Sequence, residues 1–260
     1  MPVKKMSADK VVVTGIVLSV MPMGDYDRRI TILTKERGKI GVFAKGARRP
    51  GSAFLAYTQV CVFGEFTLYK GRSSYNLSDA VVKNYFPELR NDVEKAYYGM
   101  YFCEVADYLS REGNDEKELL KLLYTSLRAL AAGSISNELI KAVFELKCMY
   151  VNGEGPMLEE CVCCHDKPEK RYFNSELGGC VCETCKSKVQ TGEVMSLNDS
   201  SWYALWFIAA TPPERLYTFT VSDEVLRELK KLGTTYLKCR TLHEFEGAQL
   251  LKIVSNRVDN

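Results

Sequence analysis

Two pairs of cysteines have the spacing of a metal site. Cys161 and Cys164 form one C-x2-C pair, and Cys182 and Cys185 form a second after 17 intervening residues. A two-residue gap lets a tight turn place two thiolates on one ion, and two such pairs complete the tetrahedral shell of structural zinc. The spacing therefore predicts one structural Zn²⁺ held by these four cysteines.

Three neighbouring side chains compete for this role. Cys163 adjoins Cys164, Cys180 lies two residues before Cys182, and His165 follows Cys164 directly. The C-x2-C spacing favours the four cysteines of the two pairs. Replacement of one of these ligands by one of the three neighbours stays an alternative. A shell of four cysteines leaves no open position for catalysis, and neither histidine of the chain lies in the H-x-E motif of zinc deaminases.

Basic residues gather in the first 50 positions. The segment at residues 45–50, Lys-Gly-Ala-Arg-Arg-Pro, places three cations in six residues. The arginine fork binds phosphate oxygens bidentately, and aromatic rings stack on bases. Of the nearby aromatic residues, Phe43 and Phe54 fit a core better, whereas Tyr26 and Tyr57 lie near loops. The residues predicted to contact nucleic acid are Arg28, Arg29, Lys39, Lys45, Arg48, Arg49 and Tyr57.

The charge of the 260-residue chain is unevenly spread. The formal net charge is +2, but residues 1–83 hold 14 Lys and Arg against 6 Asp and Glu, whereas residues 84–260 hold 21 against 27. Residues 1–83 thus carry a net charge of +8 and residues 84–260 a net charge of −6. Such an asymmetry is typical of a chain in which one region binds a polyanion and the other does not. A hydrophobic content of 46% excludes a disordered chain.

The elements that would position the cations are strands. Short β-branched or alternating segments, separated by turn residues, cover residues 11–20, 28–34, 39–44, 59–69 and 75–82. Five strands with a longer connection after the third fit the five-stranded OB-fold, whose closure removes exposed edges. In that fold the face of the second and third strands binds single strands.

Helical periodicity follows and surrounds the cysteine-rich segment. Helices are predicted at residues 91–110, 115–132, 136–151, 199–210 and 222–242. Their N-caps include Ser136 and either Asn114 or Asp115. The fold class is therefore α+β, an OB barrel and then an all-α domain with an inserted zinc module. The predicted boundaries are 1–83 for the OB-fold that binds nucleic acid, 84–156 for the first helical part, 157–192 for the zinc module and 193–260 for the closing helices.

Other features bear on the compartment. Four scattered cysteines, Cys61, Cys103, Cys148 and Cys239, lie in apolar stretches and predict buried thiols. Free thiols beside a metal cluster fit a reducing cytoplasm. Residues 1–10 have no apolar segment typical of a signal peptide, and the longest apolar run, residues 202–210, is shorter than a membrane helix.

The sequence resembles a known family in two regions. Residues 31–50, TILTKERGKIGVFAKGARRP, and the preceding Gly24-Asp25-Tyr26-Asp27 are similar to the N-terminal motif of the RecO family, the bacterial recombination mediators. The order of barrel, helices, zinc module and closing helices is also similar. Within this resemblance, the matching basic positions are Arg28, Lys39, Lys45, Arg48 and Arg49.

The resemblance implies a DNA repair protein that is not an enzyme. Such proteins bind single- and double-stranded DNA without sequence specificity and anneal complementary strands. With RecR they help load RecA onto DNA covered by single-stranded DNA-binding protein. A cytoplasmic, nucleoid-associated protein without membrane contact is then expected.

Three other functions are weighed against this interpretation. A zinc-dependent nuclease or hydrolase would need a carboxylate cluster, a catalytic histidine or an open zinc shell. An RNA- or ribosome-associated OB and zinc-ribbon protein would use the same cations, because they bind either polymer. A purely protein-binding scaffold would show no salt-dependent affinity for nucleic acid.

Overall fold

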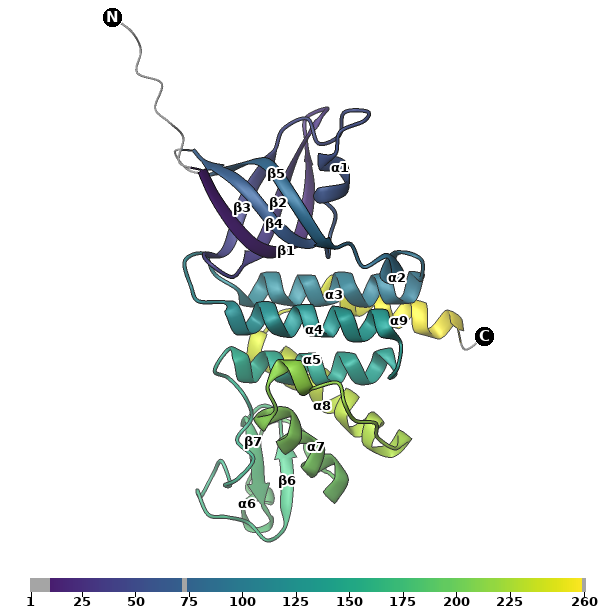
Figure 1. The fold of residues 1–260 in the computed structure, drawn as a ribbon. Helices are drawn as coiled ribbons and strands as arrows, with labels where there is room; N and C mark the ends of the chain where they lie inside the picture. The colour runs from purple at the N-terminus through teal and green to yellow at the C-terminus, as the bar shows by residue number, and fades with distance from the viewer. Residues whose placement is uncertain (1–9, 72–73, 259–260) are drawn as a thin grey trace, which may run out of the picture.

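The computed structural model describes residues 10–71 and 74–258. Residues 1–9, most of the segment for which the sequence predicts no signal peptide, lie outside the described residues. Figure 1 shows a β-barrel at one end of the molecule, layers of helices in the middle and a small β-rich module at the other end. Mixed α+β architecture is therefore confirmed.

The barrel has the five predicted strands. They are β1 (Lys10–Met23), β2 (Asp27–Thr34), β3 (Gly38–Ala44), β4 (Phe63–Lys70) and β5 (Tyr75–Asn84). They close in the order β1-β2-β3-β5-β4, with β3 and β5 parallel and the other pairs antiparallel. A short helix, α1 (Phe54–Tyr57), lies in the longer connection between β3 and β4. The predicted closed OB-like barrel is thus confirmed.

Alternation along the strands divides the barrel residues between two cores. Ile30 and Ile32 of β2 point inward and pack with Val42 and Phe66 in the barrel interior. Leu33, on the opposite face of β2, packs instead into the core of the helical part. Because side chains alternate between the two faces of a strand, one β-strand contributes to both cores. The apolar core therefore continues from the barrel into the helices.

Helices follow β5 directly. They are α2 (Pro87–Arg90), α3 (Val93–Leu109), α4 (Lys117–Ala132) and α5 (Asn137–Val151). Ser136 is the N-cap of α5, as predicted, and its hydroxyl accepts the N–H of Leu139. The predicted N-cap of α4 is wrong, because that position is Glu116 and its side chain makes no capping hydrogen bond. The carboxylate of Asp115 accepts the N–H of Lys117 from one residue further out.

The closing helices include one that the sequence analysis missed. Helix α7 (Asp199–Ala210), the 3-10 turn η1 (Pro213–Arg215) and helix α8 (Asp223–Thr241) lie where helices or a break were predicted. Helix α9 (Glu246–Val258) was not predicted. The Glu104 carboxylate on α3 accepts the N–H groups of Glu246 and Gly247, both at 2.8 Å. The free N–H groups in the first turn of α9 are thus bonded by a side chain 142 positions earlier, and the local sequence contains no sign of this partner.

The cysteine-rich segment forms its own small module. It contains β6 (Arg171–Asn174), β7 (Gly179–Cys182), α6 (Glu183–Lys186) and β8 (Val194–Ser196), with sheet order β7-β6-β8. Strands β6 to β8 lie beyond the five strands that the sequence analysis assigned to the barrel. Arg171 connects the module to α7, because its guanidinium lies 5.3 Å from the ring of Trp202 and 4.5 Å from that of Trp206.

The turn between β2 and β3 docks against the loop between α3 and α4. Gly38 has φ +64°, and an added Cβ would lie 2.5 Å from the Arg111 carbonyl oxygen. The N–H of Lys39 donates to that same carbonyl at 3.0 Å. Only glycine allows this approach without displacing backbone, so this turn fixes the barrel on the helices.

Burial of the scattered cysteines follows the prediction at three positions. Cys61, Cys103 and Cys148 are buried, but Cys239 is half-buried on the last turns of α8. Residues at the end of a surface helix keep one side in contact with water, which explains the difference. None of the helices in the described part of the chain is long and apolar enough to cross a membrane.

Candidate nucleic-acid interface and metal cluster

Four cysteines of the small module converge on one point. The Sγ atoms of Cys161, Cys164, Cys182 and Cys185 all lie within 4.8 Å of one another, close enough to bind one metal ion. Cys161 and Cys185 are buried, Cys182 is half-buried and Cys164 is exposed. The cluster therefore has a protected inner side and a solvent-facing outer side.

Two turns position these thiols. Cys161 and Cys164 lie on a loop before β6, while Cys182 ends β7 and Cys185 belongs to α6. Gly178, with φ +95°, closes the turn between β6 and β7 by donating to the Asn174 carbonyl at 3.1 Å. The turn at Gly178 and Gly179 therefore brings the second pair back to the first.

Backbone N–H groups surround the inner thiols. The N–H groups of Cys182 and Cys163 lie 3.3 and 3.5 Å from the Sγ of Cys161, and the N–H of Cys185 lies 3.3 Å from the Sγ of Cys182. Burial opposes ionisation of Cys161, but these donors outweigh burial and lower the pKa of its thiol to about 6. Because the thiolate is the form that binds metal, this environment suits a ligand.

The three competing side chains lie outside the cluster. Among the described residues, the group with metal-binding geometry contains the four C-x2-C cysteines and not Cys163, Cys180 or His165. Cys180 points into the main core, where burial raises the pKa of its thiol to about 11. A buried neutral thiol in an apolar core is a packing residue and not a ligand.

The basic loop at residues 45–50 is held against the turn between β1 and β2. The Asp27 carboxylate accepts the N–H of Gly46 at 2.7 Å, and the Tyr26 carbonyl accepts the N–H of Arg48 at 2.8 Å. Ala47 is fully buried in the barrel core and anchors the loop between its cations. Asp27 and Ala47 position this loop, and sequence reasoning missed both, since neither carries a charge that binds phosphate.

Three of the predicted DNA contacts have hydrogen-bond partners inside the molecule: Arg48, whose Nη1 donates to the Gly24 carbonyl at 3.1 Å, and the two cations Arg28 and Lys39. The Nη1 of Arg28 donates to the carbonyl of Leu55 at 3.2 Å and to the hydroxyl of Thr58 at 3.0 Å, so Arg28 holds the connection around α1. The Nζ of Lys39 lies 2.9 Å from the Asp107 carboxylate on α3. The structure therefore gives Arg28 and Lys39 positioning roles in the fold.

Arg48 and the remaining predicted cations lie exposed at the free end of the barrel. Ion pairs formed by the described residues include none with Arg29, Lys45, Arg48 or Arg49. The side chain of Tyr26 is 52% exposed, and the Arg49 guanidinium lies 5.5 Å from its ring. Unpaired cations beside an exposed aromatic ring form a surface suited to phosphates and bases.

The structure places Tyr57 and Phe43 differently from the sequence analysis, whereas Phe54 packs against the core as expected. Tyr57 and Phe54 are half-buried and pack against the barrel core, and their rings are 6.3 Å apart. Phe43, interpreted as a core residue, lies on the outer face of β3 directly opposite Arg29 of β2. Its neighbour Val42 fills the interior, so strand alternation turns Phe43 outward.

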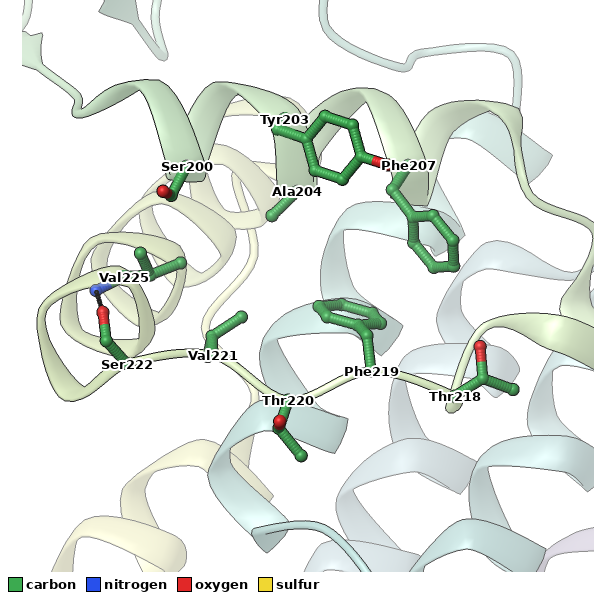
Figure 2. A pocket seen from close by; sticks show the side chains of 10 residues that line it. All are labelled: Ser200, Tyr203, Ala204, Phe207, Thr218, Phe219, Thr220, Val221, Ser222 and Val225. Atoms are coloured by element: carbon green, nitrogen blue, oxygen red, sulfur yellow. Dashed lines mark hydrogen bonds between the residues drawn. The ribbon is translucent and has the colours of Figure 1, made fainter.

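A hollow of about 420 Å³ lies on the helical part, away from this basic surface. Figure 2 shows it between α7 and the segment that leads into α8, with Phe207 and Phe219 facing each other. Their ring centroids are 4.9 Å apart, and Tyr203, 72% exposed, lies at the opening. Of the described residues, only apolar and hydroxyl-bearing ones line it, a surface suited to an apolar group and not to phosphate.

Comparison with protein families matches both parts of the chain. Residues 6–86 match the family described as "Recombination protein O N terminal", and residues 90–246 match "Recombination protein O C terminal". The first range spans the described barrel, and the second spans helices α3 to α8 with the cysteine module.

Similar proteins match along most of their length. A "DNA repair protein RecO" of Acetivibrio thermocellus is 31% identical over 92% of this chain and 95% of its own. Proteins with the same name from Exiguobacterium sp. (34% identical, 87% of this chain and 89% of the relative) and Alkaliphilus metalliredigens (37%, 66% and 70%) also match. Barrel, helices and cysteine module thus occur in a chain that belongs to the RecO family of DNA repair proteins.

Proposed function

We propose that this protein is a non-enzymatic mediator of DNA repair and recombination. It binds single- and double-stranded DNA without sequence specificity and anneals complementary strands. With RecR it helps load RecA onto DNA covered by single-stranded DNA-binding protein, at the nucleoid in the cytoplasm. The relatives, which are named DNA repair proteins, support the general role.

The observation that carries the proposal is the unpaired basic surface at the free end of the barrel. Arg29, Lys45, Arg48 and Arg49 are exposed, and the loop that bears three of them is fixed by Asp27. Cations held in place release counterions when they meet phosphates, which gives strong binding that is independent of sequence and sensitive to salt. Neutralising two strands at once lowers the repulsion that opposes annealing.

We assign a structural zinc ion to the four-cysteine cluster. The thiols fit the tetrahedral shell that zinc takes in closed sites, and the N–H donors around Cys161 favour its thiolate. The ion would hold together a module whose own apolar core contains few residues. RecR and single-stranded DNA-binding protein are assigned to the helical part, whose net negative charge keeps it away from DNA.

The test is a salt titration of DNA affinity with the full chain. Arg48→Glu combined with Arg49→Glu should lower the affinity for single strands and for duplex, and it should reduce the salt slope for duplex by about 2. The matched control is Arg128→Glu combined with Lys188→Glu, which changes the net charge equally at exposed positions on α4 and in the cysteine module. Equal affinity and slope for both double variants would contradict the proposed surface.

Two further measurements separate the alternatives. A strand-annealing assay on DNA covered by single-stranded DNA-binding protein should show a slower rate for the loop variant than for the control variant. Matched DNA and RNA oligomers should then compete for the protein. A clear preference for RNA would favour an RNA- or ribosome-associated role, since the exposed cations bind either polymer.

A further inference from the structure

A hollow of about 300 Å³ lies on the outer face of the barrel, apart from the loop at residues 45–50. One wall consists of Arg29, Gly41 and Phe43 from β2 and β3, and a second wall consists of Lys70, Gly71, Ser74 and Tyr75. Its volume is at the small end of ligand sites, which span about 300–1,000 Å³. One flat group fits such a space, whereas a duplex does not.

The first wall combines a ring with a cation. Register places Arg29 directly opposite Phe43, and the guanidinium carbon lies 5.9 Å from the ring centroid. Gly41, two residues before Phe43 on the same face, has no side chain, and a Cβ there would lie 3.5 Å from a guanidinium nitrogen of Arg29. Because Gly41 has no side chain, the hollow stays open, and the guanidinium of Arg29 can lie over this part of β3.

The second wall adds charge of the same sign. Lys70 is exposed at the end of β4, and Arg37 lies 6.0 Å from the ring of Tyr75, whose hydroxyl it approaches at 3.4 Å. Glu112, from the loop after α3, is the acidic residue that lines the hollow. Two cations, Arg29 and Lys70, therefore line the hollow together with the rings of Phe43 and Tyr75, and the Glu112 carboxylate is there as an acceptor.

We propose that this hollow is a niche for one unpaired base of a single strand. The base stacks on Phe43 and the guanidinium of Arg29, while Arg29 and Lys70 contact the flanking phosphates. A base inside a duplex is stacked on both faces and cannot enter, so the niche distinguishes single strands from duplex. The inference rests on the proposed DNA binding. In it, the loop at residues 45–50 binds phosphates, and the niche binds one base.

Two variants test the niche in the full-length protein. Phe43→Leu removes the aromatic face but keeps an apolar side chain on the outer surface. Gly41→Val fills the niche with a residue that strands accept, and its extended backbone tolerates a side chain. The control is Tyr85→Leu, which removes a tyrosine that is 37% exposed between β5 and α2, outside the niche.

The measurement is fluorescence anisotropy with three probes of equal length: an oligo-dT strand, an abasic strand and a blunt duplex. Both niche variants should bind oligo-dT roughly 5- to 100-fold more weakly, the range expected for one lost base stack. Their affinity for the abasic strand and the duplex should stay within about twofold of the unmodified protein. The Tyr85→Leu protein should bind all three probes unchanged.

Several results would overturn the niche. Unchanged oligo-dT affinity in both variants, or an equal loss for all three probes, would show that no base enters the hollow. If the unmodified protein bound none of the probes, the proposed DNA binding itself would fail. Circular dichroism melting of each variant shows whether a loss of affinity comes from unfolding, and a folded Gly41→Val protein keeps the test decisive if Phe43→Leu unfolds.

Discussion

The Nζ of Lys39 on β3 lies 2.9 Å from the Oδ1 of Asp107 on α3 and 2.5 Å from the carbonyl oxygen of the same residue. This contact joins the barrel to the helices. Lys39 was predicted from the sequence to contact DNA, but in the structure its charge has a partner within the fold. The assignment of Lys39 can be tested by separating its effect on stability from its effect on binding.

Lys39→Met should lower the free energy of unfolding by about 1–2 kcal/mol, because a charged hydrogen bond at a half-buried junction is lost. Its duplex affinity should stay within about threefold of the unmodified protein. Urea denaturation and anisotropy measure the two effects. A fall in affinity as large as that of the Arg48 and Arg49 double variant, without loss of stability, would return Lys39 to the DNA surface.

Gly38→Ala should destabilise the protein by more than the left-handed backbone alone explains. A Cβ at Gly38 would meet the Arg111 carbonyl at 2.5 Å, whereas one at Gly24, φ +53°, would meet nothing within 4 Å. Both substitutions force alanine into a conformation that costs about 1–2 kcal/mol. Only Gly38→Ala should also separate the barrel from the helices.

Thermal melts of the two glycine variants give the measurement. Gly38→Ala should melt several degrees below Gly24→Ala, since about 1 kcal/mol shifts the melting temperature of a chain this size by roughly 2–4 °C. Equal melting temperatures would show that the turn between β2 and β3 can move away from the α3–α4 loop at little cost.

Removal of a cysteine from the cluster should remove the metal. Cys161→Ser and Cys185→Ser should each reduce the zinc content from one ion per chain to nearly none, and the melting temperature should fall. Cys163→Ser is the control, because Cys163 is exposed and outside the cluster. Metal analysis of the purified proteins decides this, and a loss of zinc from the Cys163→Ser protein would contradict the assigned ligand set.

Alkaline pH should weaken the contact of α8 with the segment that follows α5, just before the cysteine module. The Tyr236 hydroxyl donates to the carbonyl of Glu154 at 2.8 Å, and burial raises the pKa of Tyr236 from its ordinary value of 10 to about 12. The unfolded chain therefore loses this proton at lower pH than the folded chain. The stability that Tyr236 contributes is complete below pH 10 and is lost as pH rises from 10 to 12.

Urea denaturation at pH 8, 9, 10 and 11 tests this dependence. Tyr236→Phe should make the decline above pH 10 shallower, whereas Tyr203→Phe, at a tyrosine that is 72% exposed, should leave it unchanged. Identical slopes for the unmodified and Tyr236→Phe proteins would show that other buried groups account for the whole decline.

Features set by short-range spacing were predictable from the sequence. The cysteine pairs and the five strands depend on turns and alternation within a few residues, and both were found as expected. The convergence of the four thiols followed as well, since two C-x2-C pairs that share one ion leave few ways to arrange them.

Features set by distant residues were not predictable. Lys39 and Arg49 have the same charge in the sequence, but only Lys39 meets a carboxylate, and that carboxylate is 68 positions away. Phe43 looked like a core residue because its neighbours are apolar, and only the strand register shows that it faces outward. Helix α9 depends on Glu104, which no local pattern connects to it.

The shared core has a consequence for any transfer between a DNA strand bound to the barrel and a protein bound to the helices. Leu33 of the barrel packs in the same cluster as the helices, and Figure 1 shows the barrel and the cysteine module at opposite ends of the molecule. A joint that is filled with close-packed side chains does not swivel. A strand held at one end and a protein held on the helices would therefore keep a fixed distance and angle, so any transfer between them must come from movement of the bound partners.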